Sequence, residues 1–104
     1  MEDLSNYHFP STKQRYNSVC RAYKKYLQRI DTLTKEGFSE SLHYYYRKPS
    51  EAKQRVWHYW QDKLTNIAII SHNTQRITLG GIIEHSGTRY FAYITPSNNY
   101  ILEI

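Results

Sequence analysis

The segment RITLGGIIEHSGTRYFAYIT, residues 76–95, decides the fold of this 104-residue chain. It holds two runs rich in β-branched and aromatic residues, separated by HSG (85–87), which has a good turn composition. Two such runs joined by a short turn predict neighbouring antiparallel strands. The runs TNIAIIS (65–71) and YILEI (100–104) on either side have the same character. We therefore predict a four-stranded antiparallel β-meander over residues 65–104.

Two adjacent glycines, Gly80 and Gly81, lie inside the run that precedes the HSG turn. Glycine weakens a strand interior, so its presence there marks either a β-bulge or a place where other atoms come close to the backbone. We expect a bulge or the close approach of a helix at this pair.

The first half of the chain has a helical period instead of a period of two. Over residues 12–36, apolar side chains recur at spacings of three and four, which places them on one helical face. These side chains are Tyr16, Val19, Cys20, Tyr23, Tyr26, Leu27, Ile30 and Leu33. Ser11 is the expected N-cap, because its hydroxyl can accept from the free amides of the first turn.

Two shorter helical patterns follow, over residues 38–48 and about 51–64, divided by Pro49. Together these patterns predict an α+β fold in which two or three N-terminal helices (11–64) pack on one face of the C-terminal β-meander. With an N-terminal arm (1–10), residues 1–104 form a single domain in this prediction, as the chain length favours.

The positive charge is confined to the helical half. The chain has fourteen basic and nine acidic residues, a formal charge of +5. Residues 1–64 hold twelve of the basic and seven of the acidic residues, whereas residues 65–104 hold two of each. Positive charge concentrated in one half of a protein attracts phosphates or acidic protein surfaces.

Several classes of protein are disfavoured by what the sequence lacks. No apolar run approaches the ~20 residues needed to cross a bilayer, and the N-terminus MEDLSNYHFP lacks the pattern of a secretory signal. Cys20 is the one cysteine, so no internal disulfide can form, which favours a reducing compartment. We expect a cytoplasmic protein that does not engage membranes.

No motif identifies a metal site or a cofactor. The five histidines include no pair at helical spacing, and Cys20 falls on an apolar helical face, where an unreactive thiol is expected. Phosphate loops, dinucleotide fingerprints and nucleophile elbows are also missing from the sequence. We therefore predict no metal and no cofactor.

One acid/base group remains at the second β-turn, where Glu84, His85 and Arg89 lie close in sequence. A carboxylate or imidazole base beside an arginine that stabilises a phosphorane would suffice for RNA cleavage without a metal. The alternative interpretation is that these residues are polar because turns are exposed.

The predicted helix-covered sheet with acid/base residues is similar in topology to small toxin endoribonucleases that act on ribosome-bound messenger RNA. Such a resemblance would imply a ribonuclease. This chain departs from that pattern because it has no clear strand before the helices, and its last two strands are apolar instead of arginine-rich.

Two surfaces could bind a partner. A helical wheel places a basic stripe on the first helix, opposite or flanking its apolar face, and this stripe can follow a phosphate backbone. Its residues are Lys13, Arg21, Lys24, Lys25 and Arg29. The second surface combines aromatic and basic side chains that could stack on unpaired bases or anchor a protein interface. Its residues are Tyr44, Arg47, Arg55, Trp57 and His58.

Three functions remain open at this point. The leading hypothesis is a small non-enzymatic binding protein, of the kind that phages and mobile elements encode, that contacts nucleic acid or a host nucleoprotein. The first alternative is an inhibitor that binds an acidic surface of a host immunity complex without touching nucleic acid. The second is a metal-free endoribonuclease. The oligomeric state is not indicated by the sequence.

Overall fold

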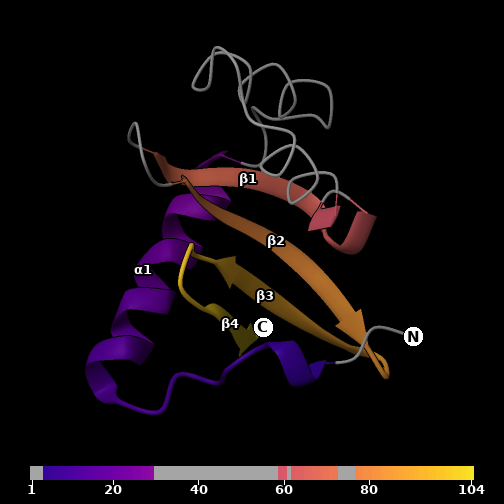
Figure 1. Cartoon of the computed structure of the whole chain (residues 1–104), viewed down its shortest axis with the longest axis horizontal. Coiled ribbons are helices and arrows are strands. Elements are labelled where there is room, and N and C mark those ends of the chain that lie inside the picture. Colours follow the sequence, from indigo (N-terminus) through magenta and orange to yellow (C-terminus); the bar gives the residue numbers. More distant parts are fainter. Residues whose placement is uncertain (1–3, 30–58, 61, 73–76) are drawn as a thin grey trace.

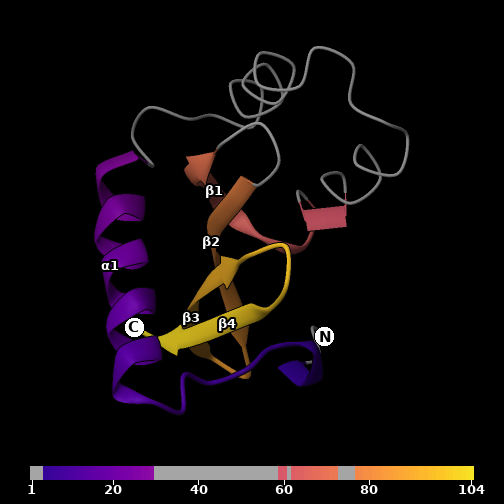
Figure 2. The ribbon, with the colours of Figure 1, turned by 60° about the vertical axis from the view of Figure 1, so that its left-hand side comes forward.

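The computed structural model describes residues 4–29, 59–60, 62–72 and 77–104. Their elements are η1 (Leu4–Asn6), α1 (Lys13–Arg29), β1 (Thr65–His72), β2 (Ile77–His85), β3 (Thr88–Ile94) and β4 (Asn99–Glu103). The strands form one antiparallel sheet in the order β1-β2-β3-β4, and α1 lies across one of its faces (Figures 1 and 2). The predicted α+β fold with a C-terminal β-meander is confirmed.

The predicted helices fall only partly within the described residues. α1 confirms the helix that was predicted over residues 12–36, as far as Arg29. Residues 59–60 and 62–63 are helical, in agreement with the end of the third predicted helix. The second predicted helix (38–48) and the remainder of the other two lie outside the described residues.

The N-cap of helix α1 lies one residue later than predicted. The Oγ1 atom of Thr12 accepts from the backbone N–H of Arg15 at 3.1 Å, and the carbonyl of Thr12 accepts from the N–H of Tyr16 at 2.9 Å. Thr12 is therefore the N-cap, and the choice of Ser11 was wrong. Both residues carry a hydroxyl, so composition alone does not decide between them.

The contact between α1 and the sheet is narrow and aromatic. Val19, Ala22 and Tyr26 are buried, and the ring of Tyr26 lies 5.2 Å from the ring of Phe91 in β3. Tyr23 packs against the same phenylalanine at 5.0 Å between ring centroids. These side chains form the core between the helix and the sheet.

The apolar face predicted for this helix was too wide. Tyr16 and Leu27, which were expected in the core, are 48% and 46% exposed. Their positions fall on one flank of the helix, and the sheet covers only the strip centred on Val19 and Ala22. The two side chains therefore form a partly apolar flank beside the polar face.

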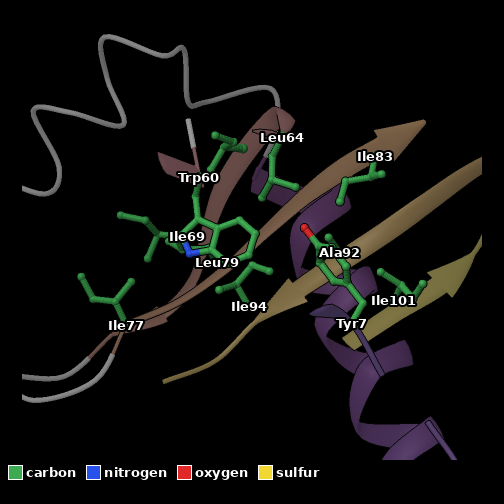
Figure 3. Packing of buried hydrophobic residues seen from close by; sticks show 11 residues of the cluster. Tyr7, Trp60, Leu64, Ile69, Ile77, Leu79, Ile83, Ala92, Ile94 and Ile101 are labelled. Carbon is green, nitrogen blue, oxygen red and sulfur yellow. The ribbon is translucent and has the colours of Figure 1, made fainter. Parts of the chain in front are cut away.

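The sheet buries both of its faces, and the prediction of a single buried face was wrong. Away from α1, the side chains of Tyr7, Trp60 and Leu64 pack on a second apolar cluster that includes Leu79 and Ile101 (Figure 3). The reason is visible in β2, where nearly every residue from Ile77 to Ile83 is buried. Continuous apolar runs of this kind are typical of strands that are covered on both sides.

Other side chains come close to both strand glycines, but none of these nearest side chains belongs to a helix, so the predicted approach of a helix is not confirmed. A Cβ atom on Gly81 would lie 2.8 Å from the Cβ of Leu64, the residue that follows the described helical turn. A Cβ atom on Gly80 would lie 2.8 Å from Cε1 of Phe91. The register shifts between β1 and β2 lie between Thr65 and Ala68 and between Ile69 and Ser71. The extra residues are therefore in β1, and the glycines of β2 are not in a bulge.

A tight turn joins β2 to β3. The pair His85 and Thr88 closes the ladder, and the two residues between them, Ser86 and Gly87, have φ angles of 51° and 78°. Two consecutive positive φ angles define a type I′ turn, whose twist matches that of the flanking strands. The turn therefore fixes the register at the end of the hairpin.

The N-terminal arm covers the outer edge of β4. The N–H of His8 donates to the carbonyl of Asn99 at 2.8 Å, and the carbonyl of His8 accepts from the N–H of Ile101 at 3.1 Å. This is a parallel bridge between His8 and Tyr100. It holds the arm in place where the chain enters α1 (Figure 2).

Candidate nucleic-acid interface

The polar face of α1 carries a group of exposed cations. The helix has six basic residues and no acidic residue along its seventeen positions. Four of the basic side chains project away from the buried strip and are exposed to solvent. We call this group the basic face; it consists of Lys13, Arg21, Lys24 and Lys25. All four were predicted as binding residues.

The other two basic residues of α1 contact the sheet. Nη1 of Arg29 donates to the carbonyl of Ile69 at 2.9 Å, so this predicted stripe residue also attaches the helix to β1. The guanidinium carbon of Arg15 lies 5.1 Å from the centroid of the Tyr100 ring, in the geometry of a cation–π contact. Arg15 was not predicted as a site residue. Its place four residues before buried Val19 was the signal that it lies on the sheet side.

An aromatic and apolar flank borders the basic face. The side chains of Tyr16, Cys20 and Leu27 lie along this flank of the helix, on the side of Lys13 and Lys24. A hydrogen bond between the Tyr16 and Cys20 side chains raises the pKa of Tyr16 above its ordinary value. Tyr16 therefore presents a neutral, half-exposed ring beside positive charges.

The hairpin group predicted for acid/base chemistry is divided between two faces. Nε of Arg89 lies 3.7 Å from Oε1 of Glu84, and the two residues are cross-strand partners. His85 is the next residue along β2, so its side chain points to the opposite face of the sheet. Its Nδ1 atom is buried and has no hydrogen-bond partner within the described part of the chain. The structure brings Glu84 and Arg89 together but not His85.

Among the residues that the structure describes, no three histidine, cysteine or acidic side chains gather where they could hold a metal ion. None of the helices in the described ranges combines the length and the apolar character that crossing a bilayer requires.

The second predicted binding surface falls in a part of the chain that is not described. Its residues are Tyr44, Arg47, Arg55, Trp57 and His58, and all five lie within residues 30–58. The nearest described residues are Tyr59 and Trp60. Tyr59 is 45% exposed, and its ring lies 5.4 Å from Nζ of Lys63.

Comparison with known proteins gives no relative to which this site could be matched. No protein-family model, no curated protein and no solved structure matches the chain. Function is therefore inferred from the side chains described above.

Proposed function

We propose that this protein binds nucleic acid through the basic face of α1 and does so without catalysing a reaction. The observation that supports this proposal is the row of four exposed cations on a helix that contains no acidic residue. A solvated helix surface commonly mixes both charges, and neighbouring opposite charges stabilise it. A surface of one sign instead repels itself, and a polyanion relieves that repulsion.

The dimensions of α1 suit a phosphate backbone. Seventeen residues at 1.5 Å each give a helix of about 25 Å. Lys13 stands at its first turn and Lys24 and Lys25 near its last, so cations occur along most of that length. Each cation that meets a phosphate releases counterions, which favours binding at low salt.

The flank beside the basic face favours single strands. The ring of Tyr16 is 48% exposed, and a base-paired duplex offers no open base face on which this ring could stack. Unpaired bases stack on exposed aromatic rings, and neighbouring cations hold the backbone. We therefore expect single-stranded DNA or RNA to bind more tightly than duplexes of the same length.

The decisive experiment measures affinity for labelled single- and double-stranded oligonucleotides at two salt concentrations. Lys24→Glu should weaken binding by about tenfold at low salt, because one attraction becomes a repulsion. Lys63→Glu is the matched control. Lys63 lies on the helical turn between Trp60 and Leu64, which packs on the sheet face opposite α1, and the charge change is the same.

The same experiment separates the proposal from its two alternatives. Absence of binding to every oligonucleotide at low salt would overturn the proposal in favour of a protein-binding inhibitor that recognises an acidic surface. Cleavage of RNA in EDTA that is lost on His85→Ala would instead identify an endoribonuclease. Equal losses from Lys24→Glu and Lys63→Glu would show that net charge matters and the basic face does not.

A further inference from the structure

A hollow lies beside β4, where the N-terminal arm leads into α1 (Figure 2). Polar side chains from the arm, from the start of the helix and from the turn before β4 border it, together with one aromatic ring. These residues are His8, Ser11, Thr12, Arg15, Asn98 and Tyr100. Tyr7 and Phe9 also border the hollow, but they pack on the sheet face away from α1 and are not part of the site.

Arg15 supplies a cation in a fixed position. Its guanidinium carbon lies 5.1 Å from the centroid of the Tyr100 ring, and Tyr100 is itself 8% exposed and therefore held by the core. No acidic side chain occurs among the described residues that border the hollow. A guanidinium stacked on a ring can still donate from its edge, and its fork of N–H groups matches two oxygens of a phosphate.

His8 packs against the same ring as Arg15. The bridge between His8 and Tyr100 is parallel, so the two side chains point to the same face of the sheet. Their ring centroids are 6.4 Å apart, with 57° between the planes. An imidazole carries at least one ring N–H, so Tyr100 holds two nitrogen donors, from Arg15 and His8, on the α1 side of the sheet.

Uncharged donors complete the border of the hollow. Oγ1 of Thr12 accepts from the backbone N–H of Arg15 at 3.1 Å, so this hydroxyl can donate its own hydrogen to a ligand. Asn98 lies on a turn fixed by Thr95, whose Oγ1 accepts from the N–H of Asn98 at 2.9 Å and donates to its carbonyl at 2.7 Å. These donors belong to different segments, so an anion with several oxygens can accept from more than one of them.

We propose that this hollow binds a phosphomonoester group, whether at the end of a nucleic-acid strand or on a small phosphorylated molecule. A phosphomonoester has three unesterified oxygens and about two negative charges near neutral pH, whereas a phosphodiester inside a strand has two such oxygens and one charge. Arg15 can hold two of the three oxygens, and the third can accept from His8 or from an uncharged donor.

The inference goes beyond the proposed function and does not require it. The basic face is exposed and meets the phosphodiesters along a strand, whereas Arg15 packs on the sheet and faces a hollow. A small phosphorylated molecule meets the same donors as a strand end. The site can therefore be tested without any oligonucleotide.

The test is a titration of isotopically labelled protein followed by backbone amide spectra. Methyl phosphate, a monoester, and dimethyl phosphate, a diester, are the two probes. Methyl phosphate should shift the amide signals of His8, Thr12 and Arg15 at millimolar concentrations. Dimethyl phosphate should bind at least about fivefold more weakly, because it lacks one acceptor oxygen and about one charge.

Variants assign the contacts. Arg15→Gln removes the charge and should weaken methyl phosphate about fivefold or more, and Arg15→Lys should restore part of this loss, because it keeps the charge without the fork. Asn98→Ala removes an uncharged donor and should weaken the probe about threefold. Arg21→Gln removes the same charge from the basic face and should change the affinity less than about twofold, the effect of a screened distant charge. Amide spectra of the free variants report whether each one is folded.

Oligonucleotides with a 5′-phosphate, with a 3′-phosphate and with neither identify the source of the group. A gain of about fivefold from one terminal phosphate that is lost in Arg15→Gln would support the inference, with a strand end as the ligand. Equal affinity of the three oligonucleotides, with methyl phosphate still bound, would support it with a small phosphorylated molecule as the ligand.

The outcomes also separate the inference from the proposed function. Binding of methyl phosphate without binding of any oligonucleotide would overturn the proposed function and support the hollow as a site. Absence of shifts at the hollow with millimolar methyl phosphate would overturn the inference, even if oligonucleotides bind the basic face. Equal binding of the two probes, or equal effects of Arg15→Gln and Arg21→Gln, would also overturn it.

Discussion

Tyr26 is the clearest single residue at which to test the packing of α1 on the sheet. The side chain is 1% exposed, and its hydroxyl has no hydrogen-bond partner in the described part of the structure. We predict that Tyr26→Phe leaves the free energy of unfolding at neutral pH unchanged or raises it by up to about 1 kcal/mol, because a buried unpaired hydroxyl is removed. Urea denaturation measures this. A loss above about 1 kcal/mol would show that the hydroxyl makes a stabilising contact.

The same residue makes stability depend on alkaline pH. Burial, and secondarily the neighbouring Tyr23, raises the pKa of Tyr26 from 10.0 to about 12, although Arg89 lowers it in part. Between these values the unfolded chain has lost this proton and the folded chain keeps it. The Tyr26 contribution is therefore complete below pH 10 and is lost as pH rises toward 12.

We predict that wild type loses on the order of 1–2 kcal/mol more than Tyr26→Phe over this pH range. Parallel urea denaturation series at neutral and alkaline pH measure the difference, and the variant controls for the chain's other tyrosines. Identical pH dependence in the two proteins would mean that Tyr26 titrates normally.

Substitutions of Gly87 test whether the hairpin turn requires a positive φ angle at this residue. Its φ angle is +78°, and no described residue apart from its own chain neighbours has an atom within 4 Å of the place that a Cβ would occupy. Gly87→Ala should therefore lower the free energy of unfolding by about 1–2 kcal/mol through strain, without a steric clash. Gly87→Asn should lower it less, since asparagine tolerates this region. Equal losses in urea denaturation would contradict the assigned turn.

At the scale of the elements, the strands were predictable and the packing of the helix was not. The turn compositions bounded the strands to within about one residue, as in β1, predicted over 65–71 and observed as Thr65–His72. For α1, the period of three and four gave a broad apolar arc, but the sheet covers only part of it. Ala22 was not part of the predicted face, because its position lies at the edge of that arc. Its small size is compatible with its burial against the sheet.

The hydrogen bond that attaches the C-terminal end of α1 to β1 can be tested with two alanine variants. Arg29 donates to the carbonyl of Ile69 in β1, whereas Lys25 belongs to the exposed basic face. Arg29→Ala should lower the free energy of unfolding by about 1 kcal/mol, and Lys25→Ala should change it by less than about 0.5 kcal/mol. Thermal or urea denaturation compares the two. Equal effects would mean that the Arg29 hydrogen bond does not stabilise the fold.

At the scale of the whole molecule, local patterns predicted the basic face, whereas the surroundings of Arg15 depend on long-range contacts. A helical wheel places Lys24 and Lys25 on the polar side without any tertiary information. Arg15 packs on Tyr100, which comes from the other end of the chain, and no spacing in the sequence connects the two residues. The separation of His85 from Glu84 could have been foreseen, because adjacent residues of a strand point to opposite faces.

The whole-molecule charge distribution makes a quantitative prediction for salt. If all four cations of the basic face meet phosphates of a single strand, the slope of log affinity against log salt is about −3, so affinity falls about 50-fold between about 50 and 200 mM salt. Lys24→Glu combined with Lys25→Glu should make the slope shallower by about 1–2. Lys63→Glu lowers the net charge but should leave the slope unchanged, because Lys63 lies on the turn that packs on the far face of the sheet. A slope that the double variant does not alter would place the phosphates elsewhere on the protein.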